Sequence, residues 1–557
     1  MNTTESFTQP ISQSSDRRND LDALRAFAML LGIVLHGAVS FIPYAGVIWG
    51  VQDFQSNPLY AVLLSSIHGW RMPLFFLVSG FFTAMLLKKC GLRALLAHRF
   101  KRIFLPMMLA MVTIIPLLLV VSGYVRSQGG EETTQEANES PRSNLADESY
   151  SKNKKLDVDV FKSVVIGDQA SLASFLNQGG DVDVKDEQGS TPLHVACLFG
   201  RAEMAKLLLN AGASLDARNN DGLRPEALLK LDWGTTAYIA QLVQLPVRQD
   251  DVLEGRELIG QSISQKTGRS VMASLQAETD GGRLEGMIAL LFYFPVFHHL
   301  WFLWFLCWLV LGFALIVKLT QTFRIPAIPS SLLTSATRYA WIIPLVAVPQ
   351  YFMAQAENAY GPDTSTGIFP IPAVFIYYAI FFGYGALYFG ANDRDVKVGK
   401  GFWWTLPFAL FILFPVGLSL KGAETTGYRI LFSVLQVSYT WVMSFAMIGL
   451  FHRLFSSQRL WIRYVSDSSY WLYLAHLPLI ILLQFLVRNW QLPSMLKFTF
   501  VCSVSIGLLL ISYQLFVRGT FLGALLNGRR YPLRETPSKP KNEESDAEKT
   551  VLTQSNA

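Results

Sequence analysis

Several histidines and arginines stand inside stretches that are otherwise apolar, where an ionisable side chain is costly and usually has a function. The clearest pair is Arg25 and His36, eleven residues apart in LDALRAFAMLLGIVLH. At 100° and 1.5 Å per residue, the two lie within about 20° of one helix face and about 16 Å apart. An imidazole titrates near neutral pH and can act as a general base. The spacing therefore predicts a transmembrane cleft in which His36 is a functional side chain; the alternative is a structural histidine bonded to a neighbouring helix.

A second group of basic residues follows along the chain. His68 and Arg71 are one helical turn apart, and they either line the same cavity as His36 or pair with each other beside Pro73. Arg99 and Arg102 are also one turn apart and precede an apolar run. Their guanidinium groups could hold phosphate groups in a bidentate manner, with Lys101 alongside, or they could simply mark the inner side of a membrane.

Two further histidines lie later in the sequence, next to or within apolar segments. His299 precedes a Trp-rich run that is typical of a helix start at the membrane interface. His476 lies within the apolar sequence SYWLYLAHLPLI. Either histidine could line a cavity that meets His36, and for His476 helix packing is the alternative.

The elements that position these residues are membrane spans. Of 557 residues, 51% are hydrophobic and only 16% are charged, which is typical of a membrane protein. We expect an all-α fold, a polytopic membrane helical bundle of about ten spans of roughly 20 residues each. The apolar windows are 22–45, 59–87, 103–124, 299–317, 338–356, 368–390, 402–420, 429–451, 468–487 and 495–517.

The basic residues of the connecting segments predict the orientation. Lys and Arg are frequent in 88–102, 318–337, 391–401 and 452–467, and they are rare in the alternate loops. The positive-inside rule therefore predicts that both termini are cytoplasmic. The expected location is the cell's inner membrane. The net charge of +6 is explained in the same way, so no nucleic acid is expected as a partner. The four cysteines are scattered without a CxxC pair, and no metal site is expected.

A long polar stretch separates the third and fourth spans and predicts an inserted soluble domain on the outer side of the membrane. Within it, residues 186–222 resemble an ankyrin repeat through Thr191-Pro192-Leu193-His194. Such repeats stack as helix pairs and commonly bind protein, so a protein partner is one expectation and a spacer or lid is the other. The expected division is 1–18 disordered tail, 19–124 spans 1–3, 125–155 linker, 156–285 ankyrin insertion, 286–518 spans 4–10 and 519–557 disordered tail.

The membrane segments resemble the acyltransferase-3 family, in particular its glucan biosynthesis branch. The resemblance rests on the Arg25-x10-His36 spacing and on RMPLFFLVSGFF, HRFKRIFLP, HHLWFLWFL and SDSSYWLYLAHLPL. It implies that His36 corresponds to the family's essential histidine, Arg25 to its motif partner, and Arg99 and Arg102 to its arginine pair.

What the resemblance implies is an O-acyltransferase. Acyl-coenzyme A would be the donor substrate, with its phosphates held by Arg99 and Arg102, and no cofactor is expected. A carbohydrate hydroxyl such as that of a glucan would lose its proton to His36 as it attacks the thioester, or would react with an acyl-histidine intermediate. A transporter of an acylated or glycosylated substrate and an ankyrin-bearing membrane sensor are the alternatives from other classes.

Overall fold

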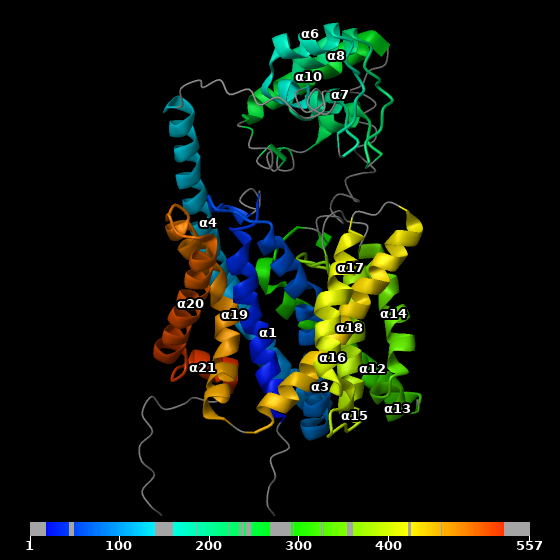
Figure 1. Ribbon diagram of the computed structural model, residues 1–557, viewed down its shortest axis with the longest axis vertical. Helices are drawn as coiled ribbons and strands as arrows, with labels where there is room; N and C mark the ends of the chain where they lie inside the picture. The colour runs from blue at the N-terminus through cyan, green and yellow to red at the C-terminus, as the bar shows by residue number, and fades with distance from the viewer. Residues whose placement is uncertain are drawn as a thin grey trace, which may run out of the picture.

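The computed structural model describes a helical membrane bundle and a separate helical insertion (Figure 1). It describes residues 18–43, 49–139, 160–267, 291–353 and 360–528, apart from short gaps at 187, 221, 232, 234–235, 237–238, 241–244, 246, 293, 325, 327, 422–424 and 458. Every regular element in these ranges is helical. Eight stretches are long and apolar enough to cross a membrane, so the predicted all-α, multi-pass fold is confirmed.

Each predicted span contains a helix. One of the eight apolar stretches, Leu59–Val125, contains two crossing helices. Helix α14 has only 16 residues and is therefore not among the eight. The crossing helices are α1 (Asn19–Val39), α3 (Leu59–Arg99), α4 (Leu105–Glu139), α12 (Trp301–Thr322), α14 (Arg338–Met353), α15 (Pro372–Gly390), the succession α16 (Phe402–Phe408), η5 (Ala409–Leu413) and α17 (Phe414–Ser419), then α18 (Thr426–Phe455), α19 (Leu460–Val487) and α20 (Ser494–Ser512).

Short elements connect or extend the crossing helices. They are η1 (Phe100–Phe104), η3 (His298–Leu300), α13 (Ser330–Thr334), η4 (Lys397–Gly399), η6 (Tyr513–Val517) and α21 (Phe521–Asn527). In place of an open loop at 88–102, α3 contains one non-helical residue, Gly91, with φ 76°. A residue without Cβ adopts this backbone conformation readily, so the chain can reverse there within a single position. Thr83 and Arg99 are each eight residues from Gly91, and the reversal brings them together: Arg99 Nη2 donates to Thr83 Oγ1 at 2.8 Å.

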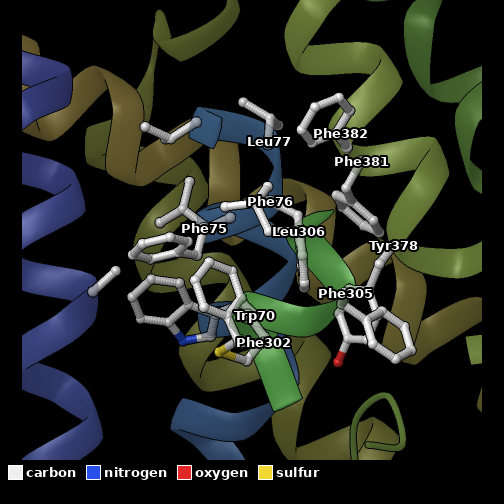
Figure 2. Close-up of a cluster of buried hydrophobic side chains, with 14 of the residues drawn as sticks. Trp70, Phe75, Phe76, Leu77, Phe302, Phe305, Leu306, Tyr378, Phe381 and Phe382 are labelled. Atoms are coloured by element: carbon white, nitrogen blue, oxygen red, sulfur yellow. The ribbon is translucent and has the colours of Figure 1, made fainter. Parts of the chain in front are cut away.

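The centre of the bundle is an aromatic cluster between α3, α12 and α15 (Figure 2). The rings of Phe75 and Phe302 meet edge to face with centroids 4.4 Å apart. Next to them, Gly80 packs directly on the carbonyl of Phe382, and Gly385 packs on that of Leu77. Small residues allow the two helix backbones to approach closely, which is how helices associate when the hydrophobic effect between them is weak.

The insertion contains paired short helices, as the ankyrin resemblance predicts. They are α6 (Gln169–Asn177), α7 (Pro192–Leu198), α8 (Ala202–Asn210), η2 (Pro225–Lys230) and the longer α10 (Gln249–Thr267), which packs on α7, α8 and η2. The side chain of His194 closes a capping box with Thr191, and its Nε2 donates to Leu223 O at 3.0 Å. Burial lowers the pKa of His194, so the ring is held neutral as a structural hydrogen-bonding group.

Two expected boundaries differ from the structure. Helix α4 continues to Glu139, through the first half of the segment 125–155 that was expected to be a linker. The Glu and Gln residues there are good helix formers, so a polar composition does not end a helix that has already begun. Likewise α21 occupies part of the expected tail 519–557. The rest of the linker, and the tails 1–17 and 529–557, lie outside the described residues.

Candidate active site

Three histidine rings from different helices meet at the end of α1 where it leads into the loop toward α3. His36 of α1 and His476 of α19 have ring centroids 5.2 Å apart, and His299 of η3 is 5.6 Å from His476. The structure therefore places His476 in ring contact with His36, and His299 in ring contact with His476. We call these three side chains the histidine cluster. Its members are 177 residues or more apart in sequence, so only the folded bundle brings them together.

Trp49 and Gln484 hold His36 from two sides. The indole of Trp49 stacks on the imidazole at 5.5 Å between centroids, with 6° between the ring planes. Gln484 Nε2 donates to the carbonyls of His36 and Gly37 at 3.0 Å each, and Trp49 Nε1 donates to Gln484 Oε1 at 2.7 Å. A stacked ring with a tethered backbone fixes the orientation that a general base needs.

Arg71 places a positive charge next to the histidine cluster. A Cβ at Gly32, one turn from His36 on α1, would lie 2.5 Å from Arg71 Nη1, so the missing side chain makes room for the guanidinium. Arg71 is within electrostatic range of both His36 and His476. His68, one turn from Arg71, donates from Nε2 to Pro362 O at 2.9 Å. His68 therefore connects α3 to the loop before α15.

The loop before α15 adds a carboxyl group at the same end of the bundle. The hydroxyl of Tyr378 donates to the backbone carbonyl of Asp363 at 3.2 Å, which fixes the loop on α15. Burial raises the pKa of the Asp363 carboxyl to about 6. This carboxyl therefore changes its charge close to neutral pH.

A second basic site lies at the other end of α1. Arg25 pairs with Asp22 at 3.4 Å and donates to Ser466 Oγ at 3.4 Å. Arg99 is close enough to Arg25 for the two positive charges to repel each other. Its Nε is buried without a hydrogen-bond partner in the described part of the protein. Two facing guanidinium groups with an unused donor form a site that suits an anion.

The other two basic residues of this segment are placed differently. Lys101 is exposed. The guanidinium of Arg102 lies against Gly528, directly after the last residue of α21. A helix C-terminus carries a partial negative charge and attracts a cation, so Arg102 also anchors α21.

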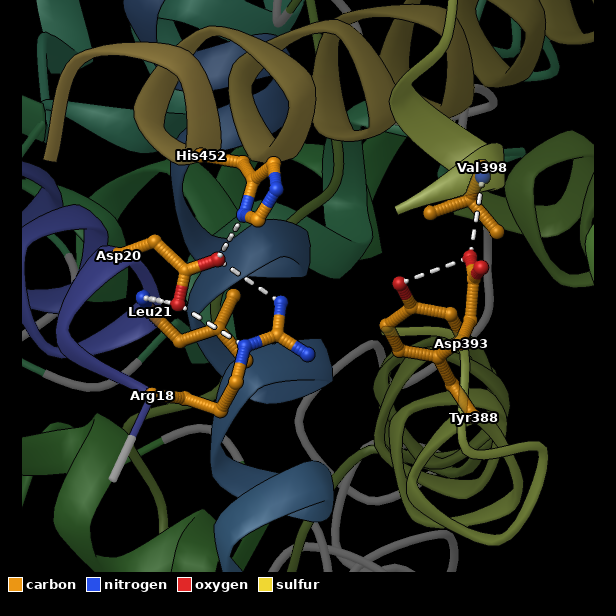
Figure 3. A network of polar contacts seen from close by, with 7 residues as sticks. All are labelled: Arg18, Asp20, Leu21, Tyr388, Asp393, Val398 and His452. Carbon is orange, nitrogen blue, oxygen red and sulfur yellow. Dashed lines mark hydrogen bonds and ion pairs between the residues drawn. The ribbon is translucent and has the colours of Figure 1, made fainter. Parts of the chain in front are cut away.

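A polar network fixes the start of α1 and thereby the height of Arg25 (Figure 3). The buried carboxylate of Asp20 accepts hydrogen bonds from Arg18 Nε at 2.9 Å, Arg18 Nη2 at 2.8 Å and His452 Nδ1 at 2.9 Å. Beside it, Asp393 accepts from the Tyr388 hydroxyl at 3.1 Å. His452 of α18 is therefore a structural partner of α1, and it is at the opposite end of α1 from His36.

Sequence reasoning missed three contributors to the site. Gln484 could have been found, because an amide inside an apolar run is as unusual there as an imidazole. Tyr473, whose hydroxyl donates to His299 O at 2.6 Å, is one turn before His476 and shares its helix face. Trp49 lies in the connection between α1 and α3, where a single tryptophan gives no signal. Arg25 is placed with Arg99 and not in the histidine cluster, in keeping with its separation of about 16 Å from His36 along α1.

Comparison with known proteins supports both parts of this architecture. The family described as acyltransferase domain matches residues 18–140 and 263–516, and ankyrin repeats match 176–225. Glucans biosynthesis protein C of Escherichia coli K12 is 36% identical over 104 residues, which is 19% of this chain and 25% of that protein. Human protein phosphatase 1 regulatory subunit 27 is 36% identical over 72 residues, 13% of this chain and 47% of that protein.

The chain thus spans a quarter to a half of the length of these relatives. The family match is much broader: it covers more than half of the chain, includes every residue of the histidine cluster and the facing pair Arg25 and Arg99, and leaves out only the inserted repeats and the ends. The chain therefore belongs to the acyltransferase domain family, with ankyrin repeats inserted between the two parts of the domain.

Proposed function

We propose that this protein is a membrane-bound O-acyltransferase. It moves an acyl group, acetyl or succinyl, from acyl-coenzyme A on the cytoplasmic side to a hydroxyl of an extracytoplasmic carbohydrate such as a glucan. Membership of the acyltransferase domain family supports the reaction class. The acceptor class is taken from the printed name of one relative, glucans biosynthesis protein C.

The observation that carries the proposal is that α1 joins two polar sites of different chemistry. One end of this helix contributes Arg25 to a facing pair of arginines, and the other contributes His36 to the histidine cluster. The two residues are about 16 Å apart along the helix. An anion site and a base at that separation suit a donor with phosphate groups at one end of a long arm and a reactive thioester at the other.

At the inner end, Arg99 and Arg25 would hold the phosphate groups of the donor. Their mutual repulsion is relieved when an anion binds between them, and the free Nε of Arg99 supplies a further donor. The exposed Lys101, two residues after Arg99, and Arg102 would add to the positive field.

At the outer end, His36 would accept the proton of the acceptor hydroxyl as its oxygen attacks the thioester carbonyl. The new C–O bond forms the ester, the C–S bond breaks, and coenzyme A leaves as the thiol after taking up a proton. Arg71, beside Gly32, would stabilise the negative charge that develops on the carbonyl oxygen.

The proposal includes an orientation of the protein in the inner membrane. The basic residues around Lys88 and Arg453 would face the cytoplasm together with both termini, and the ankyrin insertion would face outward. On that side the repeats would offer a surface to a protein partner.

The proposal is tested with purified protein in lipid, labelled acetyl- or succinyl-coenzyme A and a glucose oligosaccharide. His36→Ala is expected to lower kcat by about 10²- to 10⁴-fold, the usual contribution of a positioned general base. Gly507→Ala on α20, where an added Cβ meets nothing within 4 Å, serves as the control, and ester formation is followed by mass spectrometry. Wild-type rates in a correctly folded His36→Ala variant would contradict the proposal.

A further inference from the structure

Two members of the histidine cluster, His299 and His476, are left without a role by the proposed chemistry. Both are close to the base: His476 is in ring contact with His36, and His299 is in ring contact with His476. His476 is 2% exposed, and an imidazole held so deeply must have its ring nitrogens accounted for.

Main-chain carbonyls determine which nitrogen of each ring carries the hydrogen. His476 Nδ1 is 2.7 Å from Tyr473 O, and His299 Nε2 is 3.1 Å from Leu474 O. A carbonyl oxygen can only accept, so these two nitrogens must donate. In the neutral rings the remaining nitrogens, His476 Nε2 and His299 Nδ1, are therefore acceptors.

Both acceptor nitrogens are buried and have no hydrogen-bond partner in the described part of the protein. Leaving a buried acceptor unpaired costs about 1–3 kcal/mol, so a ligand that donates to it gains that much. Among the described residues, no group of three His, Cys, Asp or Glu side chains is arranged to hold a metal ion. The ligand group must therefore carry a hydrogen, and it must lie beside His36.

We propose that His476 Nε2 and His299 Nδ1 form a hydroxyl-recognition subsite, which accepts the hydrogens of acceptor hydroxyls next to the one that is esterified. The subsite selects polyols, in which a second hydroxyl stands beside the reacting one, over simple alcohols. This inference rests on the proposed function, because it assumes that the reacting hydroxyl is at His36.

The first test varies the acceptor on wild-type protein. A glucose oligosaccharide is compared with derivatives in which one hydroxyl at a time is replaced by hydrogen, with acetyl- or succinyl-coenzyme A as donor. Removal of the reacting hydroxyl abolishes the ester. Removal of a second, unreacted hydroxyl is expected to lower kcat/KM by about 5- to 150-fold, the equivalent of one unpaired buried acceptor. Insensitivity to every unreacted hydroxyl would overturn the inference.

The second test uses variants of the subsite. It compares their kcat/KM for the native oligosaccharide with that for the deoxy derivative that reacts more slowly with wild-type protein. In His476→Leu the acceptor nitrogen is gone, so the ratio between native and deoxy acceptor should collapse toward one. His476→Gln, with a side-chain carbonyl that can accept at the same depth, should retain part of the ratio. Gly507→Ala on α20, where an added Cβ meets nothing within 4 Å, should leave the ratio as in wild type.

The outcomes separate the inference from the function on which it rests. If wild-type protein forms no ester with any sugar, the proposed function fails. If ester forms but the ratio is the same in His476→Leu as in wild type, only the subsite fails. A loss of folding in His476→Leu leaves the first test decisive, because that test needs no variant.

Discussion

At the scale of single residues, the absence of a side chain matters as much as its presence. Gly32 is an ordinary apolar-helix residue by sequence, yet it provides the space in which Arg71 reaches the histidine cluster. The site therefore depends on a position that carries no chemistry itself. Two predictions belong to this scale.

The first is that Gly32→Ala lowers activity without lowering stability. The added methyl group meets the flexible end of Arg71 and displaces it, whereas alanine is favoured over glycine in a helix by about 0.5–1 kcal/mol. We expect kcat/KM to fall by about 10- to 100-fold, as for a small misplacement of a catalytic group. Gly507→Ala, where a Cβ meets nothing within 4 Å, is the control for both activity and melting temperature. Equal activity of the two variants would disprove the role of Gly32.

The second concerns an ion pair that the sequence does not reveal. Lys497 Nζ of α20 is 2.6 Å from Asp53 Oδ1 in the loop after α1, and the two side chains are 0% and 1% exposed. Lys497→Ala leaves a buried carboxylate unpaired, so we expect a loss of about 3–5 kcal/mol in the free energy of unfolding.

Replacing both partners tests the physical reason for this loss. The double variant Lys497→Met with Asp53→Leu has no unpaired charge, and it should recover most of the stability lost in the single variant. Denaturation in detergent, followed by tryptophan fluorescence, measures both. A double variant as unstable as Lys497→Ala would contradict this account.

At the scale of elements, the sequence predicts helices well and contacts poorly. Every apolar window contains a helix, because length and hydropathy alone decide whether a segment crosses a bilayer. The sequence predicts that the chain turns back within 88–102, but not that the turn is a single residue, Gly91, since one glycine in a basic stretch looks the same whether it lies in a loop or between two helices. For the same reason Arg99 appeared to lie at the membrane boundary, whereas the reversal carries it back into the bundle beside Thr83.

The contact between α3 and α15 gives a prediction at this scale. In Gly385→Ala the new methyl group would collide with the backbone carbonyl of Leu77, which cannot move without separating the helices. We expect a loss of about 1–3 kcal/mol from overpacking, seen as a lower melting temperature. Gly383→Ala, two residues away on α15 with nothing within 4 Å, should melt like wild type. Equal melting of the two variants would rule out this close contact as a source of stability.

At the scale of the whole molecule, the candidate site illustrates what one sequence can and cannot show. His36, His299 and His476 could be singled out because imidazoles are rare in apolar segments, and the structure brings them together. Which helices face one another depends on the packing of all the spans. The stacking of Trp49 on His36 and the approach of Arg25 to Arg99 therefore could not be predicted from hydrophobic periodicity.

The orientation of the whole chain can be tested with its own cysteines. Cys90, at the turn beside Gly91, is exposed, while Cys197 and Cys502 are buried. If that turn is cytoplasmic, a membrane-impermeant maleimide should label Cys90 in inside-out vesicles and not in intact cells. In a Cys90→Ser background, Lys206→Cys on the exposed face of α8 should show the reverse pattern. Labelling of both sites from one side would refute the proposed topology.

The long insertion also has a consequence for the order of synthesis. Arg25 and His36 are made with the first helix, but their partners Ser466, His476 and Gln484 all belong to α19, near the end of the chain. About 160 residues between α4 and α12 have to be translated in the meantime, which takes roughly 10–30 s at bacterial or eukaryotic rates. During that interval the first three helices lie in the membrane without these partners, so the proposed site is complete only when α19, the ninth crossing helix, is inserted.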